Sequence, residues 1–144
     1  MENKQIYSIG YEGASIEAFI KILLDEHVQR IVDVRERAFS FKKGFSKKPL
    51  IEALQAAGID YVNPREIAPP REMRKSYESV GDFEGFCTAY RAHLEAEKDL
   101  LETFIGSLKP GDCLLCFEKN HERCHRKILE SFIAMTVKNL RDDA

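Results

Sequence analysis

The residue types most capable of chemistry lie in one short stretch, residues 116–126, which reads CFEKNHERCHR. It holds two cysteines, two histidines, two glutamates and two arginines, so it could supply nucleophiles, general acids and bases, metal ligands or donors to an anion. Cys124, His125 and Arg126 fall where a helix is expected to begin. A helix N-terminus and neighbouring basic side chains favour the thiolate form of a cysteine, so Cys124 is a candidate nucleophile.

The same stretch could instead bind zinc or simply pack. Cys116 and Glu118 are two apart on an expected strand and share a face, whereas Cys113 and Cys116 are three apart and face opposite ways. The C-x-x-C spacing is therefore not a zinc knuckle, and we expect no metal and no cofactor, although Cys116, Glu118, Cys124 and His125 are ligand types that zinc accepts. Cys113 and Cys87 are interpreted as buried small hydrophobes, and His121 and Glu122 as solvent-facing loop residues.

Two further segments are candidate binding residues. Gly10 and Gly13 flank Tyr11 and Glu12 directly after the first expected strand, and such glycines allow a ligand to approach the backbone, although an ordinary tight turn fits equally well. Asp33 and Arg35 end the second expected strand on one face, either as functional groups or as a structural ion pair.

The elements that must position these residues alternate along the chain. Strands are expected at 5–10, 30–34, 59–63 and 113–117. A helix capped by Ser15 follows the first strand, and a helix at 47–57, capped by Ser46 and stopped by Gly58, follows the second. A long helical region from Asp82 follows the third strand. A last helix is expected from Cys124 to Thr136, and residues 64–75 are expected to form a loop. This alternation predicts an α/β three-layer sandwich, a mostly parallel sheet of about four strands with Rossmann-like topology, in a single domain spanning 1–144.

Basic residues cluster after the expected strands. Residues 35–48 carry a net charge of +5, and residues 64–75 and 118–127 carry +2 each, although the whole chain is at −2. Ligands of open α/β sheets bind beyond the carboxyl ends of the strands, and a strand order of 3-2-1-4 would place the first and fourth strands' loops face to face there. The pattern predicts an anionic ligand, a nucleotide or nucleic acid, although exposed lysines in these segments could be merely solvated.

Composition fits a soluble protein. The chain has 144 residues, 44% apolar and 32% charged, with no apolar run long enough to cross a bilayer and no signal peptide at its start. We therefore expect a cytoplasmic protein with no membrane partner, in which all four cysteines are reduced. Phe39 and Phe41, in a basic loop, could form a homodimer contact, stack on bases or fold onto the core.

Several motifs together resemble the family known as domain of unknown function 488: SIGYEG near the N-terminus, DVR after the second strand, Ser40 and GFS before the second helix, and LLCFE followed by CHR. The resemblance spans about residues 6 to 135, and Arg37-Ala38-Phe39 departs from it where members often show a proline. It implies an α/β fold and a candidate site, but no established reaction. The residues that match the pattern are Gly10, Tyr11, Gly13, Asp33, Arg35, Ser40, Phe45, Cys116, Glu118, Cys124, His125 and Arg126.

Two functions remain open. The first is an enzyme, a hydrolase or transferase, in which Asp33 or Glu118 serves as general acid or base, or Cys116 or Cys124 as nucleophile, with His125 also among the catalytic candidates. Its ligand would be held by Gly10, Tyr11, Gly13, Arg35, Ser40, Phe45 and Arg126. The alternative is a non-catalytic nucleic-acid or nucleotide binding module with aromatic stacking faces. A structural role for Glu118, in an ion pair that closes the sheet edge, is a third reading.

Overall fold

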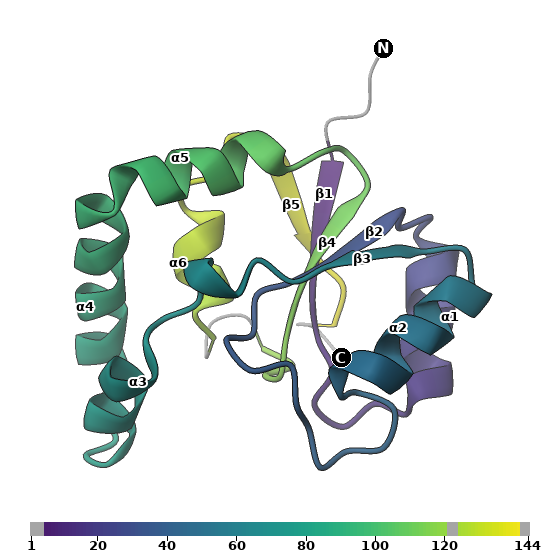
Figure 1. The fold of residues 1–144 in the computed structure, drawn as a ribbon, viewed down its shortest axis with the longest axis horizontal. Helices are drawn as coiled ribbons and strands as arrows, with labels where there is room; N and C mark the ends of the chain where they lie inside the picture. The colour runs from purple at the N-terminus through teal and green to yellow at the C-terminus, as the bar shows by residue number, and fades with distance from the viewer. Residues whose placement is uncertain (1–4, 121–123, 142–144) are drawn as a thin grey trace.

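A parallel sheet of five strands lies at the centre of the protein, with helices on both faces (Figure 1). The structure is a computed structural model that describes residues 5–120 and 124–141. The strands are β1 (Gln5–Gly10), β2 (Arg30–Asp33), β3 (Asp60–Val62), β4 (Asp112–Cys116) and β5 (Thr136–Asn139). The helices are α1 (Ile16–Asp25), α2 (Lys47–Ala56), the 3-10 turn η1 (Arg65–Ile67), α3 (Arg71–Glu78), α4 (Phe83–Ala96), α5 (Lys98–Ser107) and α6 (Arg126–Glu130). The predicted α/β three-layer sandwich is therefore confirmed.

The strand order differs from the one predicted. The sheet runs β3-β2-β4-β1-β5, so β4 lies between β2 and β1, and a fifth strand follows β1 at the edge. The predicted order 3-2-1-4 is wrong, but β1 and β4 are neighbours in both arrangements. The chain leaves β1 and β2 toward α1 and α2, whereas it leaves β4 toward α6 on the other face (Figure 1). Such a divergence opens a crevice at the carboxyl ends of these strands.

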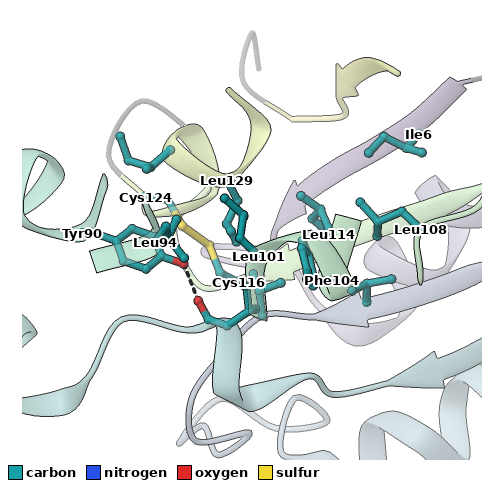
Figure 2. Close-up of a cluster of buried hydrophobic side chains, with 14 residues drawn as sticks. Ile6, Tyr90, Leu94, Leu101, Phe104, Leu108, Leu114, Cys116, Cys124 and Leu129 are labelled. Atoms are coloured by element: carbon teal, nitrogen blue, oxygen red, sulfur yellow. Dashed lines mark hydrogen bonds between the residues drawn. A yellow bond between two sulfur atoms is a disulfide. The ribbon is translucent and has the colours of Figure 1, made fainter. Parts of the chain in front are cut away.

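Alternation along the strands divides the core into two clusters. Cys113 and Leu115 of β4 pack with Phe19 of α1 and Leu54 of α2. Their neighbours Leu114 and Cys116 point to the opposite face, and there they pack with the buried side chains of α4, α5 and α6, which include Tyr90, Leu94, Leu101, Phe104, Ile128 and Leu129 (Figure 2). Each residue of β4 is fully buried because helices cover both faces of this central strand.

The helix signals are partly confirmed. Ser15 caps α1, with its Oγ accepting from the Ala18 N–H at 3.1 Å, and Gly58 follows α2 with a φ of +76° that suits glycine. Ser46 precedes α2 but makes no capping bond, because its hydroxyl instead binds the backbone of Ser40. None of the described helices is both long and apolar enough to cross a membrane.

Three element boundaries differ from those predicted. The long helical region breaks at Glu97 into α4 and α5, and part of the expected loop 64–75 forms η1 and α3. The last helix ends at Glu130, and Thr136, predicted to be helical, begins β5. Tight turns end the helix, since the N–H groups of Phe132 and Ile133 bond back three residues, to the carbonyls of Leu129 and Glu130.

Candidate functional site

Two cysteines meet beyond the end of β4. Cys116 is the last residue of β4, Cys124 lies two residues before α6, and a disulfide joins their sulfurs within the core cluster that β4 forms with α4, α5 and α6 (Figure 2). Both side chains are almost completely buried. The expectation that all four thiols are reduced is therefore wrong for this pair, because α6 packs on the face of the sheet to which Cys116 points. Cys87 and Cys113 are free thiols, and burial raises the pKa of each.

A fully buried arginine holds the disulfide against the sheet. Arg126 donates through Nε to the sulfur of Cys116 at 2.9 Å, through one terminal nitrogen to Ser8 Oγ at 2.6 Å, and through the other to the Glu118 carbonyl at 2.6 Å. Burial lowers the pKa of this guanidinium, and the charges of Glu130 and Glu118 only partly offset the effect. The predicted ligand arginine thus lies inside the protein, with its donors committed to β1, β4 and the backbone after β4.

The imidazole of His125 is neutral and faces Cys124. Burial lowers its pKa to about 4, and its Nε2 lies 2.9 Å from the carbonyl oxygen of Val34. Since a carbonyl can only accept, Nε2 carries the hydrogen and Nδ1 keeps its lone pair. Nδ1 lies 3.8 Å from the sulfur of Cys124, and Tyr90 packs edge-on against the ring. His125 can therefore accept a proton from a Cys124 thiol.

The carboxyl group of Glu118 lies beside the same sulfurs. Its Oε2 is 3.4 Å from Cys116 Sγ, and burial raises the pKa of the side chain, an effect that Arg126 reduces. With the disulfide reduced, Cys116, Glu118 and Cys124 offer three ligand atoms within 4.8 Å of one another, enough to hold a soft divalent ion. In the disulfide form the two sulfurs have no thiolate to give to a metal ion.

These groups adjoin a cavity of about 520 Å³ at the carboxyl edge of the sheet. Of the twelve predicted residues, Tyr11, Arg35, Cys116, Glu118 and His125 line it. Cys124 and Arg126 lie directly behind that wall, bonded to Cys116. The opposite wall comes from η1, α3 and α4, and its residues were not among the predicted site: Ala68, Pro69, Arg74, Tyr77, Glu78, Phe83 and Phe86. In the sequence, the net positive charge of residues 64–75 was the one feature that indicated a binding role for this segment.

The charge of the cavity is mixed. Three arginines line it, Arg35, Arg37 and Arg74, against the carboxylates of Glu36, Glu78, Asp82 and Glu118. Arg74 pairs with Glu36 at 2.8 Å, and Arg35 pairs with Asp33 at 2.7 Å. Arg37 is exposed, packs against the Phe39 ring at 5.4 Å and has no carboxylate partner within the described ranges. Among the described arginines that line the cavity, Arg37 is the one without a carboxylate partner, and Arg74 keeps its Nε without a hydrogen-bond partner.

Asp33 orients Arg35 and does not reach the cavity. Its buried carboxylate accepts from Arg35 N, Nε and a terminal nitrogen at 3.1, 2.8 and 2.7 Å, and from the Tyr61 hydroxyl at 2.6 Å. Burial opposes the charge of Arg35, but Asp33 outweighs that effect and raises the guanidinium pKa, so the arginine stays charged. The second terminal nitrogen donates to the Phe45 carbonyl at 2.7 Å. Asp33 and Arg35 therefore form a buried ion pair, one of the two alternatives that the sequence left open.

The remaining predicted residues shape the turn after β1 and the loop after β2. A Cβ on Gly10 would overlap the carbonyl of Glu118, so the chain can approach β4 here only with glycine. Arg141 from the C-terminal end donates to the Gly10 and Glu12 carbonyls at 2.7 and 2.8 Å, and Gly13 completes the turn with a φ of +80°. The predicted facing of the two loops is confirmed by bonds from the Tyr11 and Glu12 N–H groups to the carbonyls of residues 116 and 117.

Two predicted ligand residues lie away from the cavity. Phe45 is fully buried and stacks on Tyr11 with ring centroids 4.4 Å apart. The hydroxyl of Ser40 accepts from the Lys42 N–H at 3.0 Å and so organises its own loop. In the same loop Phe39 and Phe41 pack edge-on at 5.0 Å, with Phe41 almost fully exposed. His121 and Glu122, predicted to face solvent, lie outside the described residues.

Comparison of the sequence with protein-family models assigns the chain to a family. The family model described as "Domain of unknown function DUF488" matches residues 15–133, most of the chain. No curated protein and no solved structure matches it. The family resemblance noted in the sequence is thus supported independently, whereas substrate and reaction have to be argued from the site itself.

Proposed function

We propose that this chain, which belongs to the family described as domain of unknown function DUF488, is an enzyme that acts on an anionic ligand in the cavity at the carboxyl edge of its sheet. The observation that carries the proposal is convergence: Cys116, Glu118 and His125 come from two separate segments and line one concave cavity, with Cys124 and Arg126 behind it. A thiol, a carboxyl group and a neutral imidazole within one cavity are the groups that covalent catalysis uses.

The roles follow from the surroundings of each group. With the disulfide reduced, Cys116 is the nucleophile, because Arg126 at 2.9 Å stabilises its thiolate and because it lines the cavity. Glu118, whose pKa burial raises, is suited to protonate a leaving group. The thiolate would attack a phosphoryl or acyl centre to form a covalent intermediate, the leaving group would take the Glu118 proton, and water would release the product. The substrate class is a phosphate-containing compound, a nucleotide for preference, with its anionic group on Arg37.

The experiment combines binding with turnover. Reduced protein is screened by thermal shift against inorganic phosphate, nucleotides and short single-stranded DNA and RNA at two salt concentrations, because a ligand of the native state raises the midpoint. Stabilising compounds are then assayed for hydrolysis. We expect Cys116→Ser to retain the thermal shift and lose turnover, Arg37→Ala to reduce the shift, and Cys87→Ser, the matched thiol control, to behave as wild type. Turnover that survives Cys116→Ser would refute the nucleophile, and no shift with any anion would refute the ligand class.

One observation favours a second function. Phe39 and Phe41 form an exposed aromatic pair beside Arg37, in the loop with the largest basic excess, and stacking faces next to a guanidinium suit unpaired bases. A non-catalytic nucleic-acid module would bind through this loop with strong salt dependence and no turnover. Loss of DNA or RNA binding in Phe41→Ala, with Cys116→Ser unaffected, would favour it. Concentration-dependent mass in light scattering that Phe41→Ala abolishes would instead assign the pair to a homodimer contact.

A further inference from the structure

We propose that Cys116 and Cys124 form a reversible dithiol–disulfide couple that exchanges with low-molecular-weight disulfides, with Cys116 as the sulfur that reacts first and Cys124 as the sulfur that closes the bond. The proposal is independent of the enzymatic function above, because it concerns the thiols themselves and requires no other substrate. Three features carry it: the bond between the two sulfurs, their unequal access to the cavity, and the different polar group beside each one.

The two sulfurs differ in their access to the cavity. Cys116 lines the cavity, whereas Cys124 does not, although both are almost completely buried. A small thiol or disulfide in the cavity therefore meets Cys116, whereas Cys124 lies behind the lining residues Cys116 and His125. The cavity, about 520 Å³, has room for a ligand of ordinary metabolite size. The order of reaction follows from this geometry.

The polar neighbours fit the same order. Arg126 lies 2.9 Å from Cys116 Sγ and favours its thiolate, the form that attacks a disulfide. His125 holds the lone pair of Nδ1 3.8 Å from Cys124 Sγ, because its other nitrogen donates to the Val34 carbonyl. It is thus placed to take the proton of Cys124 when that thiol becomes the second nucleophile. Cys116 thus has the guanidinium of Arg126 and the carboxyl group of Glu118 beside its sulfur, whereas Cys124 has the base His125.

The exchange is balanced in two steps. The Cys116 thiolate attacks a disulfide RSSR, which breaks the S–S bond, forms a mixed disulfide Cys116–S–SR and releases RS⁻. Cys124 then loses its proton to His125 and attacks Cys116 Sγ, which forms the Cys116–Cys124 bond and releases a second RS⁻, and the proton passes on to it. The two cysteines are oxidised and RSSR is reduced to two thiols. Excess RSH drives the same steps backwards.

The test uses glutathione disulfide as the probe on the full-length reduced protein, with chelator present. The chain has four cysteines, so we expect the thiol count to fall from four to two and peptide mass mapping to show the Cys116–Cys124 link. Cys124→Ser should stop after the first step and keep one glutathionyl group on Cys116, whereas Cys116→Ser should acquire none at Cys124. His125→Gln should form the mixed disulfide at a rate near that of wild type but close it at least about tenfold more slowly, as loss of a base does.

A control variant and three defined outcomes show whether the proposed dithiol–disulfide couple exists. Cys87→Ser removes the partly exposed thiol outside the couple, and it should still lose two thiols. The proposal is overturned if wild-type protein keeps four thiols in glutathione disulfide, if the mapped bond involves Cys87 or Cys113, or if Cys116→Ser traps glutathione on Cys124 as readily as Cys124→Ser traps it on Cys116. None of these readouts depends on turnover, so the couple and the proposed enzyme can fail separately.

Discussion

Replacing Asp33 by asparagine tests whether this carboxylate is structural or catalytic. The substitution keeps the shape of the side chain but removes its charge and turns one acceptor into a donor. Asp33 is completely buried and Arg35 is 7% exposed, so water cannot replace the lost charge. The guanidinium would be left buried without a counter-charge, and either Arg35 or the Tyr61 hydroxyl would lose its acceptor.

The expected loss of stability is large for a single atom exchange. Breaking a buried ion pair from one side costs about 3–5 kcal/mol, much of it the penalty of the orphaned charge. Asp60→Asn on the adjacent strand β3 is the matched control, since Asp60 is exposed, and its effect should stay within about 0.5 kcal/mol. The double variant Asp33→Asn with Arg35→Gln should be more stable than the sum of its single changes predicts, because it removes both charges.

Urea denaturation followed by circular dichroism measures these differences as midpoint shifts at constant slope. A loss below about 1 kcal/mol in Asp33→Asn, together with abolished turnover on any substrate found, would refute the structural reading and restore Asp33 as a catalytic residue. A slope that changes along with the midpoint would point to altered compactness, and the same variants would then be compared by calorimetry.

Three other changes test the site from different sides. Burial lowers the pKa of His125 from about 6.5 in the unfolded chain to about 4 in the folded protein, so the unfolded state binds the proton more readily. The free energy of unfolding of the wild type should therefore fall, by at most about 3 kcal/mol, as the pH drops through this range. His125→Gln should flatten the dependence of the urea midpoint on pH. Gly10→Ala should cost at least about 1–3 kcal/mol in the same assay and alter Cys116 reactivity, because its Cβ displaces the Glu118 backbone; unchanged stability would contradict the close approach. Tyr90→Phe removes the 2.5 Å bond to the Ile67 carbonyl and should cost about 1–2 kcal/mol by thermal melting, whereas no change would mean that water replaces it.

The fold class could be predicted from local patterns, but the strand order could not. Apolar runs and cap residues locate β1, β2, β4 and α1 because each signal lies within the element itself. Whether β4 inserts between β2 and β1 depends on contacts between distant segments, which no local pattern records. The short edge strand β5 was not predicted, because apolar residues at helical spacing continue past the end of α6 and indicated a longer helix. The helix α3 is polar overall and buries none of its residues, so no run of apolar residues marked it in the sequence.

The site was predicted best where strand alternation decides direction. Alternation correctly separates Cys113 from Cys116, and loop placement correctly brings the Gly10 turn against the chain after β4. The disulfide was missed because Cys116 and Cys124 are eight positions apart in the sequence, and whether their sulfurs meet depends on how α6 packs on the sheet. Arg74 was missed as a cavity residue because the wall formed by η1, α3 and α4 exists only once the chain has folded.

The buried arginine and the cysteine pair act as one electrostatic unit. In the disulfide form the three described bonds of Arg126 end on a neutral sulfur, a hydroxyl and a carbonyl, so its charge lacks a direct counter-charge, and burial accordingly lowers its pKa. Reduction creates a thiol at Cys116 whose ionised form would supply that charge at 2.9 Å. An interior with a low dielectric makes this pairing far stronger than it would be in water. After reduction Arg126 therefore favours the thiolate of Cys116 over its thiol, and under the proposed function the Cys116–Cys124 bond would block this nucleophile.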